Sequence, residues 1–318
     1  MIEGSSRTDA HREVEGALAQ ELARGNSAIV KIVPVLGHLL GNEDEALFSD
    51  ETVARVKGML THQARELAIA ETDAGQQEGA ARQVSARILT LYPVLAGQPA
   101  LLRHCHALAL EWQLALRLES ERGIDPVLSP LIQALVASDE SATASLGMAS
   151  LTAQARFAQA QRRMELPLGE LPADIFNDVM HAWRAQASPA TSSAQAAAEE
   201  RMRAGFDEGN SRLALFDRLV LAMGKGVTAA LSVDHAGIAT FLSALAFASD
   251  QAREDVVAST NARQAVRLAL AMRATGLKGS AIEEQLLLLH GNIPPRMDVG
   301  AISADRAAAL LQNAGGRA

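Results

Sequence analysis

Apolar residues recur every three or four positions along most of the chain, which is the spacing of one face of an α-helix. Val53, Val56, Leu60 and Leu67 follow this spacing. No segment alternates apolar and polar residues as a half-buried strand would. The pattern therefore predicts an all-α protein. The predicted helices cover about residues 9–24, 27–40, 50–67, 84–93, 99–122, 126–137, 141–163, 172–186, 194–205, 211–223, 234–248, 250–259, 262–274, 281–290 and 303–315.

Residues that favour helix ends divide these segments. Ser49 precedes two acidic residues and can cap a helix, and Ser280 with Glu283 fits the capping-box pattern. Gly25-Asn26 and Gly291 lie where two helices are expected to end. Short connections between helices favour antiparallel pairs, so we expect a multi-helical bundle or an irregular helical-repeat (α-solenoid-like) array. No literal repeat of fixed length is present.

The stretch ELPLGELP, residues 165–172, interrupts the helical pattern most clearly, because it holds two prolines and a glycine between periodic segments. A chain of 318 residues is also long for one compact core. We therefore predict an N-terminal helical domain over residues 1–165 and a C-terminal helical domain over residues 166–318.

Composition narrows the class of protein. Hydrophobic residues make up 48% of the chain, aromatic residues only 3%, and the formal net charge is −8. An acidic chain with few stacking side chains is a poor nucleic-acid binder, so no nucleic-acid partner is expected. The single cysteine, Cys105, excludes a disulfide or a cysteine-based zinc site within one chain. The amino-terminal MIEGSSRTDA has no apolar signal region, and no stretch reaches the roughly 18 apolar residues that span a bilayer. A cytoplasmic protein without a transmembrane segment is the expectation.

The stretch LRHCHALALEW, residues 102–112, contains Cys105 between two histidines. On a helix, His104 and His106 point roughly 160° apart, so they cannot share one metal ion. Cys105 lies on an apolar stripe with Leu108 and Trp112. This stretch is therefore interpreted as helix packing.

A second constellation, ADIFNDVMHAW, carries Asp174, Asp178 and His181 on one helix face. Two carboxylates and an imidazole could bind a metal ion if a facing helix supplied further ligands. The opposite face is apolar, so the same pattern suits an ordinary amphipathic helix. The stretch MGKGVT, residues 223–228, lacks the spacing of a phosphate-binding loop. The sequence predicts no catalytic residue and no cofactor.

Two segments carry a family resemblance. LPLGELPADIFNDVMHAW, residues 166–183, and ARQAVRLALAMRATGLKGSAIEEQLLLLHGNIPP, residues 262–295, resemble the alphaproteobacterial family called domain of unknown function 2336. The resemblance covers about half of the chain, from residue 166 to the end. It implies a bacterial, all-helical protein and no reaction.

These observations favour a non-enzymatic protein–protein interaction scaffold or regulatory adaptor, with an unknown protein partner and a possible homo-oligomer. The alternative is a ligand- or metal-binding protein, or an enzyme, with a pocket between the two helical halves. The first hypothesis requires a contiguous exposed apolar patch. The second requires Asp174, Asp178 and His181 to face a concavity.

Overall fold

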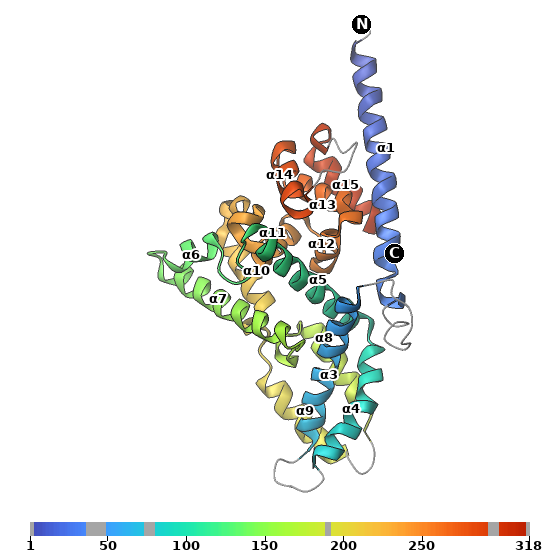
Figure 1. Ribbon diagram of the computed structural model, residues 1–318, viewed down its shortest axis with the longest axis vertical. Coiled ribbons are helices and arrows are strands. Elements are labelled where there is room, and N and C mark those ends of the chain that lie inside the picture. The colour runs from blue at the N-terminus through green and yellow to red at the C-terminus, as the bar shows by residue number, and fades with distance from the viewer. Residues whose placement is uncertain (1–2, 36–48, 73–79, 188–191, 292–298, 316–318) are drawn as a thin grey trace. The chain divides into compact units, whose positions relative to one another are not determined.

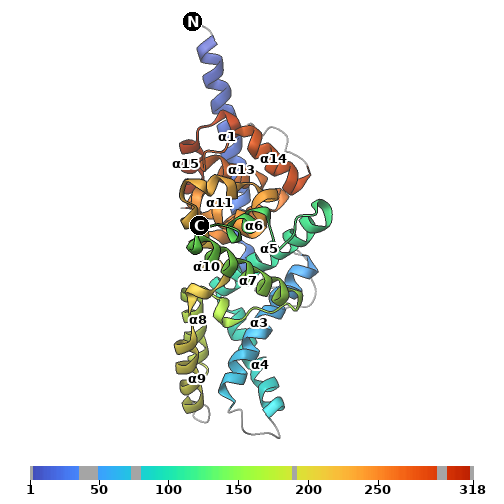
Figure 2. The ribbon, with the colours of Figure 1, turned by 90° about the vertical axis from the view of Figure 1, so that its left-hand side faces the viewer.

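The computed structural model describes residues 3–35, 49–72, 80–187, 192–291 and 299–315. Within these ranges the chain forms α-helices joined by turns and short 3₁₀-helices, with no strand, so the predicted all-α class is confirmed (Figures 1 and 2). The helices are α1 (Glu3–Val30), α3 (Asp50–Glu71), α4 (Ala80–Ala96), α5 (Pro99–Arg122), α6 (Pro130–Val136), α7 (Ser141–Arg162), α8 (Ala173–Arg184), α9 (Ser192–Gly205), α10 (Arg212–Met223), α11 (Val233–Ser249), α12 (Arg253–Ser259), α13 (Ala265–Ala274), α14 (Gly279–His290) and α15 (Ala304–Gly315). The 3₁₀-helices are η1 (Leu168–Glu170), η2 (Glu208–Asn210), η3 (Gly224–Leu231), η4 (Ala262–Gln264) and η5 (Val299–Ala301).

The helices group into two compact units. Unit 1 combines residues 1–32, 114–148 and 216–318, and unit 2 combines residues 33–113 and 149–215. The division falls within α5, α7 and α10, so these helices contribute residues to both units. The predicted boundary between an N-terminal and a C-terminal domain, at residues 165 and 166, stays a prediction.

Unit 1 is built around α11. Most residues of this helix are buried, and it packs against α6, α12, α13 and η3. From Ala236 to Ser249 its side chains are apolar or small, as expected for a helix largely enclosed by others. The helix breaks at Gly237, where φ is 71° and ψ is 162°. An added Cβ at this position would lie 3.0 Å from the Cβ of Ser129, so both the backbone and the packing require glycine.

Helix α1 lies along α13 and α15, and its N-terminal part extends beyond them in both views (Figures 1 and 2). The prediction that Gly25-Asn26 ends the first helix was wrong, because α1 continues to Val30. These two residues serve packing instead. A Cβ on Gly25 would lie 2.0 Å from Oε1 of Gln264, and Asn26 accepts a hydrogen bond from Arg267. The tertiary contact thus explains a glycine that resembled a helix stop.

Other predicted helix ends had mixed outcomes. Ser49 caps α3 by accepting a hydrogen bond from the amide of Thr52 at 3.2 Å, and Gly291 ends α14 in the left-handed conformation, so both predictions are confirmed. The prediction of a capping box at Ser280 was wrong. Helix α14 begins at Gly279, with Lys278 in the extended N-cap position. Ser280 therefore has helical backbone angles, which do not suit a capping side chain.

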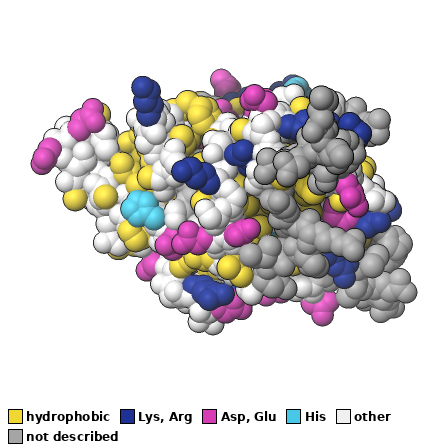
Figure 3. Space-filling model, turned by 90° about the horizontal axis from the view of Figure 1, so that it is seen from above, with side chains coloured by type: hydrophobic (Ala, Val, Ile, Leu, Met, Phe, Trp, Pro, Cys, Tyr) yellow, Lys and Arg dark blue, Asp and Glu magenta, His cyan; other side chains and the backbone are white. Residues whose placement is uncertain are grey.

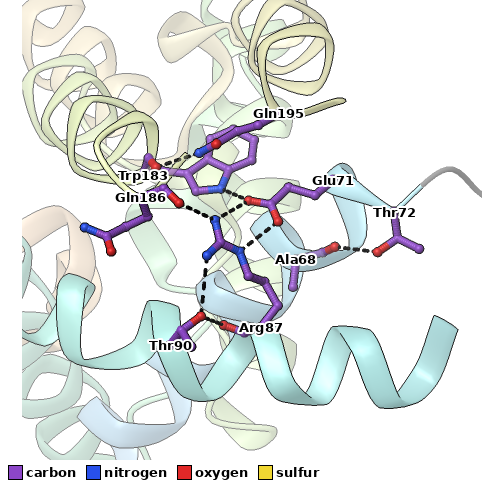
Figure 4. Close-up of polar contacts among 8 residues, drawn as sticks. All are labelled: Ala68, Glu71, Thr72, Arg87, Thr90, Trp183, Gln186 and Gln195. Atoms are coloured by element: carbon purple, nitrogen blue, oxygen red, sulfur yellow. Dashed lines mark hydrogen bonds and ion pairs between the residues drawn. The ribbon is translucent and has the colours of Figure 1, made fainter. Parts of the chain in front are cut away.

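Unit 2 pairs α3 with α4 and α9, and α8 with α4 and α9. One carboxylate joins three of these helices (Figure 4). Glu71 on α3 accepts hydrogen bonds from Nε and Nη2 of Arg87 on α4, at 2.8 and 2.7 Å, and from Nε1 of Trp183 on α8, at 2.5 Å. Gln195 on α9 donates to the carbonyl oxygen of Trp183 at 2.6 Å. The buried tryptophan therefore has its only polar side-chain atom satisfied.

None of the helices in the described ranges is long and apolar enough to cross a membrane.

Candidate functional site

A pocket of about 330 Å³ lies within unit 2. Its walls come from α5, α7, α10 and the segment between α7 and α8. Its apolar lining consists of Leu108, Phe157, Ala160, Leu166, Pro167 and Leu213. Its polar lining consists of His104, Arg156, Glu165, Glu170 and Arg212, and Gly169 completes the wall. The volume falls at the lower end of the range of about 300 to 1,000 Å³ that is typical of small-molecule sites.

One wall is the segment of residues 165–170, which we call the strap. Its backbone is tied to α3 at two points: Leu168 donates its amide to Oε2 of Glu66 at 2.8 Å, and the carbonyl oxygen of Leu166 lies 3.2 Å from Nδ1 of His62. Burial raises the pKa of Glu66. Met164, just before the strap, has a positive φ of 56°, which turns the chain out of α7. Pro167 and Gly169 of ELPLGELP thus form part of the pocket wall, while Pro172 precedes α8.

A buried ion pair forms another wall. Arg212, the first residue of α10, donates from Nη1 and Nη2 to the two carboxylate oxygens of Glu111 on α5, at 2.7 and 2.9 Å. The side chains are only 3% and 1% exposed. Nη1 also donates to Gln154 at 3.0 Å, and the guanidinium carbon lies 3.7 Å from the ring centroid of Phe157. A bidentate pair with a stacked ring is the geometry that a buried arginine requires.

The strap and α10 are joined by one further contact. Oε2 of Glu170 accepts a hydrogen bond from the backbone amide of Arg212 at 2.7 Å. This carboxylate satisfies one of the free amides at the helix start, where the helix dipole also favours negative charge. Its other oxygen lies 3.6 Å from Nη2 of Arg156 on α7. The pocket therefore carries a fixed carboxylate beside an arginine.

Comparisons with protein-family models, with curated proteins and with solved structures give no match. The resemblance to domain of unknown function 2336 stays a prediction.

The predicted metal-site residues lie elsewhere on unit 2. Asp174, Asp178 and His181 are all on the exposed face of α8, while Phe176 and Trp183 on its other face are buried. They therefore do not line the pocket. These three residues give no support to the hypothesis of a ligand or metal site between the two helical halves. Within the described ranges, no three histidine, cysteine, aspartate or glutamate side chains cluster closely enough to hold a metal ion. A metal bound at α8 stays a prediction.

The stretch LRHCHALALEW packs as predicted. Cys105, Leu108 and Trp112 are buried, so the apolar stripe is confirmed. Burial raises the pKa of the Cys105 thiol to about 12, which keeps it protonated and unreactive. Burial also lowers the pKa of His106 to about 4. His104, in contrast, lines the pocket, a role that the sequence did not indicate.

Sequence reasoning missed the charged residues of the pocket. Arg156, Glu170 and Arg212 are far apart in the chain and belong to no spaced motif. One signal was present: Glu111 follows ALAL and precedes Trp112, so a carboxylate interrupts an apolar helix face. A buried charge of this kind requires a partner, and a search for the complementary arginine could have led to α10.

We predict that Arg212→Met lowers the free energy of unfolding by about 3–5 kcal/mol, because it leaves the Glu111 carboxylate buried without its counter-charge. The double variant Arg212→Met/Glu111→Leu removes both charges and is expected to recover most of that loss. Urea denaturation of the full chain measures both variants. A double variant as unstable as the sum of the two single variants would contradict this assignment.

The buried His106 predicts a pH dependence of stability. Its folded pKa of about 4 is below the unfolded value of 6.5. Between these pH values the unfolded chain binds a proton that the folded chain excludes, so stability is lost as pH falls through this window. The expected loss is about 3 kcal/mol from about pH 6.5 to about pH 4.

The measurement is urea denaturation across this range for the unaltered chain and for His106→Gln. The substitution is expected to flatten the pH dependence. His181→Gln, at an exposed position on α8, is the matched control. An unchanged slope in His106→Gln would show that another group is responsible.

Proposed function

We propose that this protein binds a small, largely apolar organic ligand in the pocket between α5, α7, α10 and the strap. The observation that carries the proposal is a preformed cavity of about 330 Å³ with an apolar interior and a few charged groups in its wall. This combination is typical of small-molecule sites. The alternative hypothesis from the sequence required Asp174, Asp178 and His181 to face a concavity, and these three residues do not line this pocket.

The buried ion pair fixes the walls of the cavity, which is a second property of ligand sites. Arg212 and Glu111 hold α10 against α5, and Gln154 and Phe157 add contacts from α7. Each charge in the pair needs the other, so the pair fixes α10 against α5 beside the cavity. A pocket whose walls are fixed in this way binds its ligand without a large conformational cost.

The interaction-scaffold hypothesis has less support from the described surface. Its large exposed apolar residues come each from a different segment: Val30, Ile69, Leu89, Leu128, Met148, Leu221, Phe247 and Leu287. On the face in Figure 3, apolar side chains are interspersed with basic and acidic ones. No described helix thus presents a stripe of exposed large apolar residues. A protein partner stays a prediction.

The test adds a bulky side chain to the pocket wall. Gly169 lines the pocket, and a Cβ added there meets no heavy atom within 4 Å, so Gly169→Phe adds a ring without backbone strain. Gly205, at the end of α9, has the same open surroundings and does not line the pocket, so Gly205→Phe is the matched control.

Saturation-transfer NMR with the full chain reports binding of four probes: indole, benzoate, hexanoate and benzylamine. We expect at least one probe to bind the unaltered chain and Gly205→Phe, and to lose binding in Gly169→Phe. Thermal unfolding checks that both variants are folded. No bound probe, or equal binding to Gly169→Phe, would contradict the proposal.

A further inference from the structure

The pocket wall offers two opposite charges that differ in how firmly they are held. Glu170 is fixed, because its Oε2 accepts the backbone amide of Arg212 at 2.7 Å. Its Oε1 faces Nη2 of Arg156 at 3.6 Å. That separation is longer than the roughly 2.7–2.9 Å of a charge-assisted hydrogen bond. Oε1 therefore keeps capacity for a closer donor.

Arg156 is the more adaptable of the two. Its side chain is 54% exposed, and an ion pair at such a site contributes little to stability. The long, flexible side chain can turn toward a different anion at small cost. Arg156 is thus available to a ligand carboxylate.

Arg212 cannot take that role. Its guanidinium binds both oxygens of Glu111 and one oxygen of Gln154, and its face covers Phe157. A ligand carboxylate that competed for Arg212 would leave Glu111 buried without a counter-charge, which is costly. The anion-binding group of the pocket is therefore Arg156, and the cation-binding group is Glu170.

Beyond these two groups, the lining is apolar and includes Leu108, Phe157 and Leu213. A ligand that matches the whole site has a cation and an anion close together and an apolar body. We propose that the pocket binds a free α-amino acid with an aromatic or large aliphatic side chain. Its ammonium group pairs with Glu170, its carboxylate pairs with Arg156, and its side chain packs against Phe157. This assignment rests on the proposed function and specifies its ligand class.

The test compares three probes with the same phenyl body. L-Phenylalanine carries both charges, 3-phenylpropionate lacks the ammonium group, and 2-phenylethylamine lacks the carboxylate. Isothermal titration calorimetry with the full chain measures each dissociation constant. Each hydrogen bond to a charged partner is expected to contribute about tenfold or more, so L-phenylalanine should bind at least about tenfold more tightly than either analogue.

Two substitutions assign the charges. Arg156→Gln is expected to weaken L-phenylalanine and 3-phenylpropionate about tenfold and to leave 2-phenylethylamine unchanged. Glu170→Gln should weaken L-phenylalanine and 2-phenylethylamine and spare 3-phenylpropionate. The glutamine at 170 still offers an oxygen to the amide of Arg212, so the wall is retained.

Matched controls use residues that do not line the pocket. Arg162→Gln removes an exposed arginine at the end of α7, and Glu208→Gln alters a carboxylate that likewise accepts a backbone amide, that of Ala173. Neither control is expected to change any of the three affinities. Equal effects of Glu208→Gln and Glu170→Gln would overturn the assignment of the cation site.

The outcomes separate the two proposals. If the three probes bind equally and Gly169→Phe abolishes them all, the pocket is a ligand site and the zwitterion assignment is wrong. If none of the three binds, the zwitterion assignment is also wrong. Binding of indole, benzoate, hexanoate and benzylamine then decides the proposed function. Tightest binding of L-phenylalanine, with the two substitution patterns, supports both.

Discussion

The ion pair between Arg212 and Glu111 is the constraint on which the pocket depends. It crosses from the start of α10 to α5, it is almost fully buried, and it takes in Gln154 and Phe157 of α7. The backbone amide of the same arginine holds Glu170 of the strap. One residue therefore contacts every wall of the pocket. Because a buried charge cannot lose its partner without a large penalty, the three helices and the strap are held at fixed separations. The cavity beside them is a consequence of that arrangement.

The two arginines of the pocket have different surroundings and therefore different chemistry. Arg212 is saturated by protein groups and acts as part of the framework. Arg156 is half-exposed, and its one described ion pair is long. Glu170 lies between them, with one oxygen committed to the framework and one oxygen facing the exchangeable arginine. A framework charge, a fixed carboxylate and a movable cation around an apolar interior form a site that complements a small zwitterion.

The sequence predicts the local features of this fold and not its long-range contacts. The cap at Ser49 and the stripe through Cys105 depend on neighbours within two helical turns, so periodicity and residue type were sufficient. Gly25 failed as a helix stop because its contact with Gln264 comes from a distant part of the chain. The pocket likewise depends on contacts between distant parts of the chain. Its charged groups lie on α7, α10 and the strap, and no spacing rule brings them together. The break at ELPLGELP was predicted as a boundary, whereas its role as a wall depends on bonds to α3.

The decisive experiment is a crystal structure of the full chain grown with L-phenylalanine. We expect electron density for the amino acid in the pocket, with its ammonium group on Glu170, its carboxylate on Arg156 and its ring against Phe157. The Arg212–Glu111 pair should be unchanged. An empty pocket under saturating conditions, or a ligand bound only elsewhere on the protein, would contradict the zwitterion assignment.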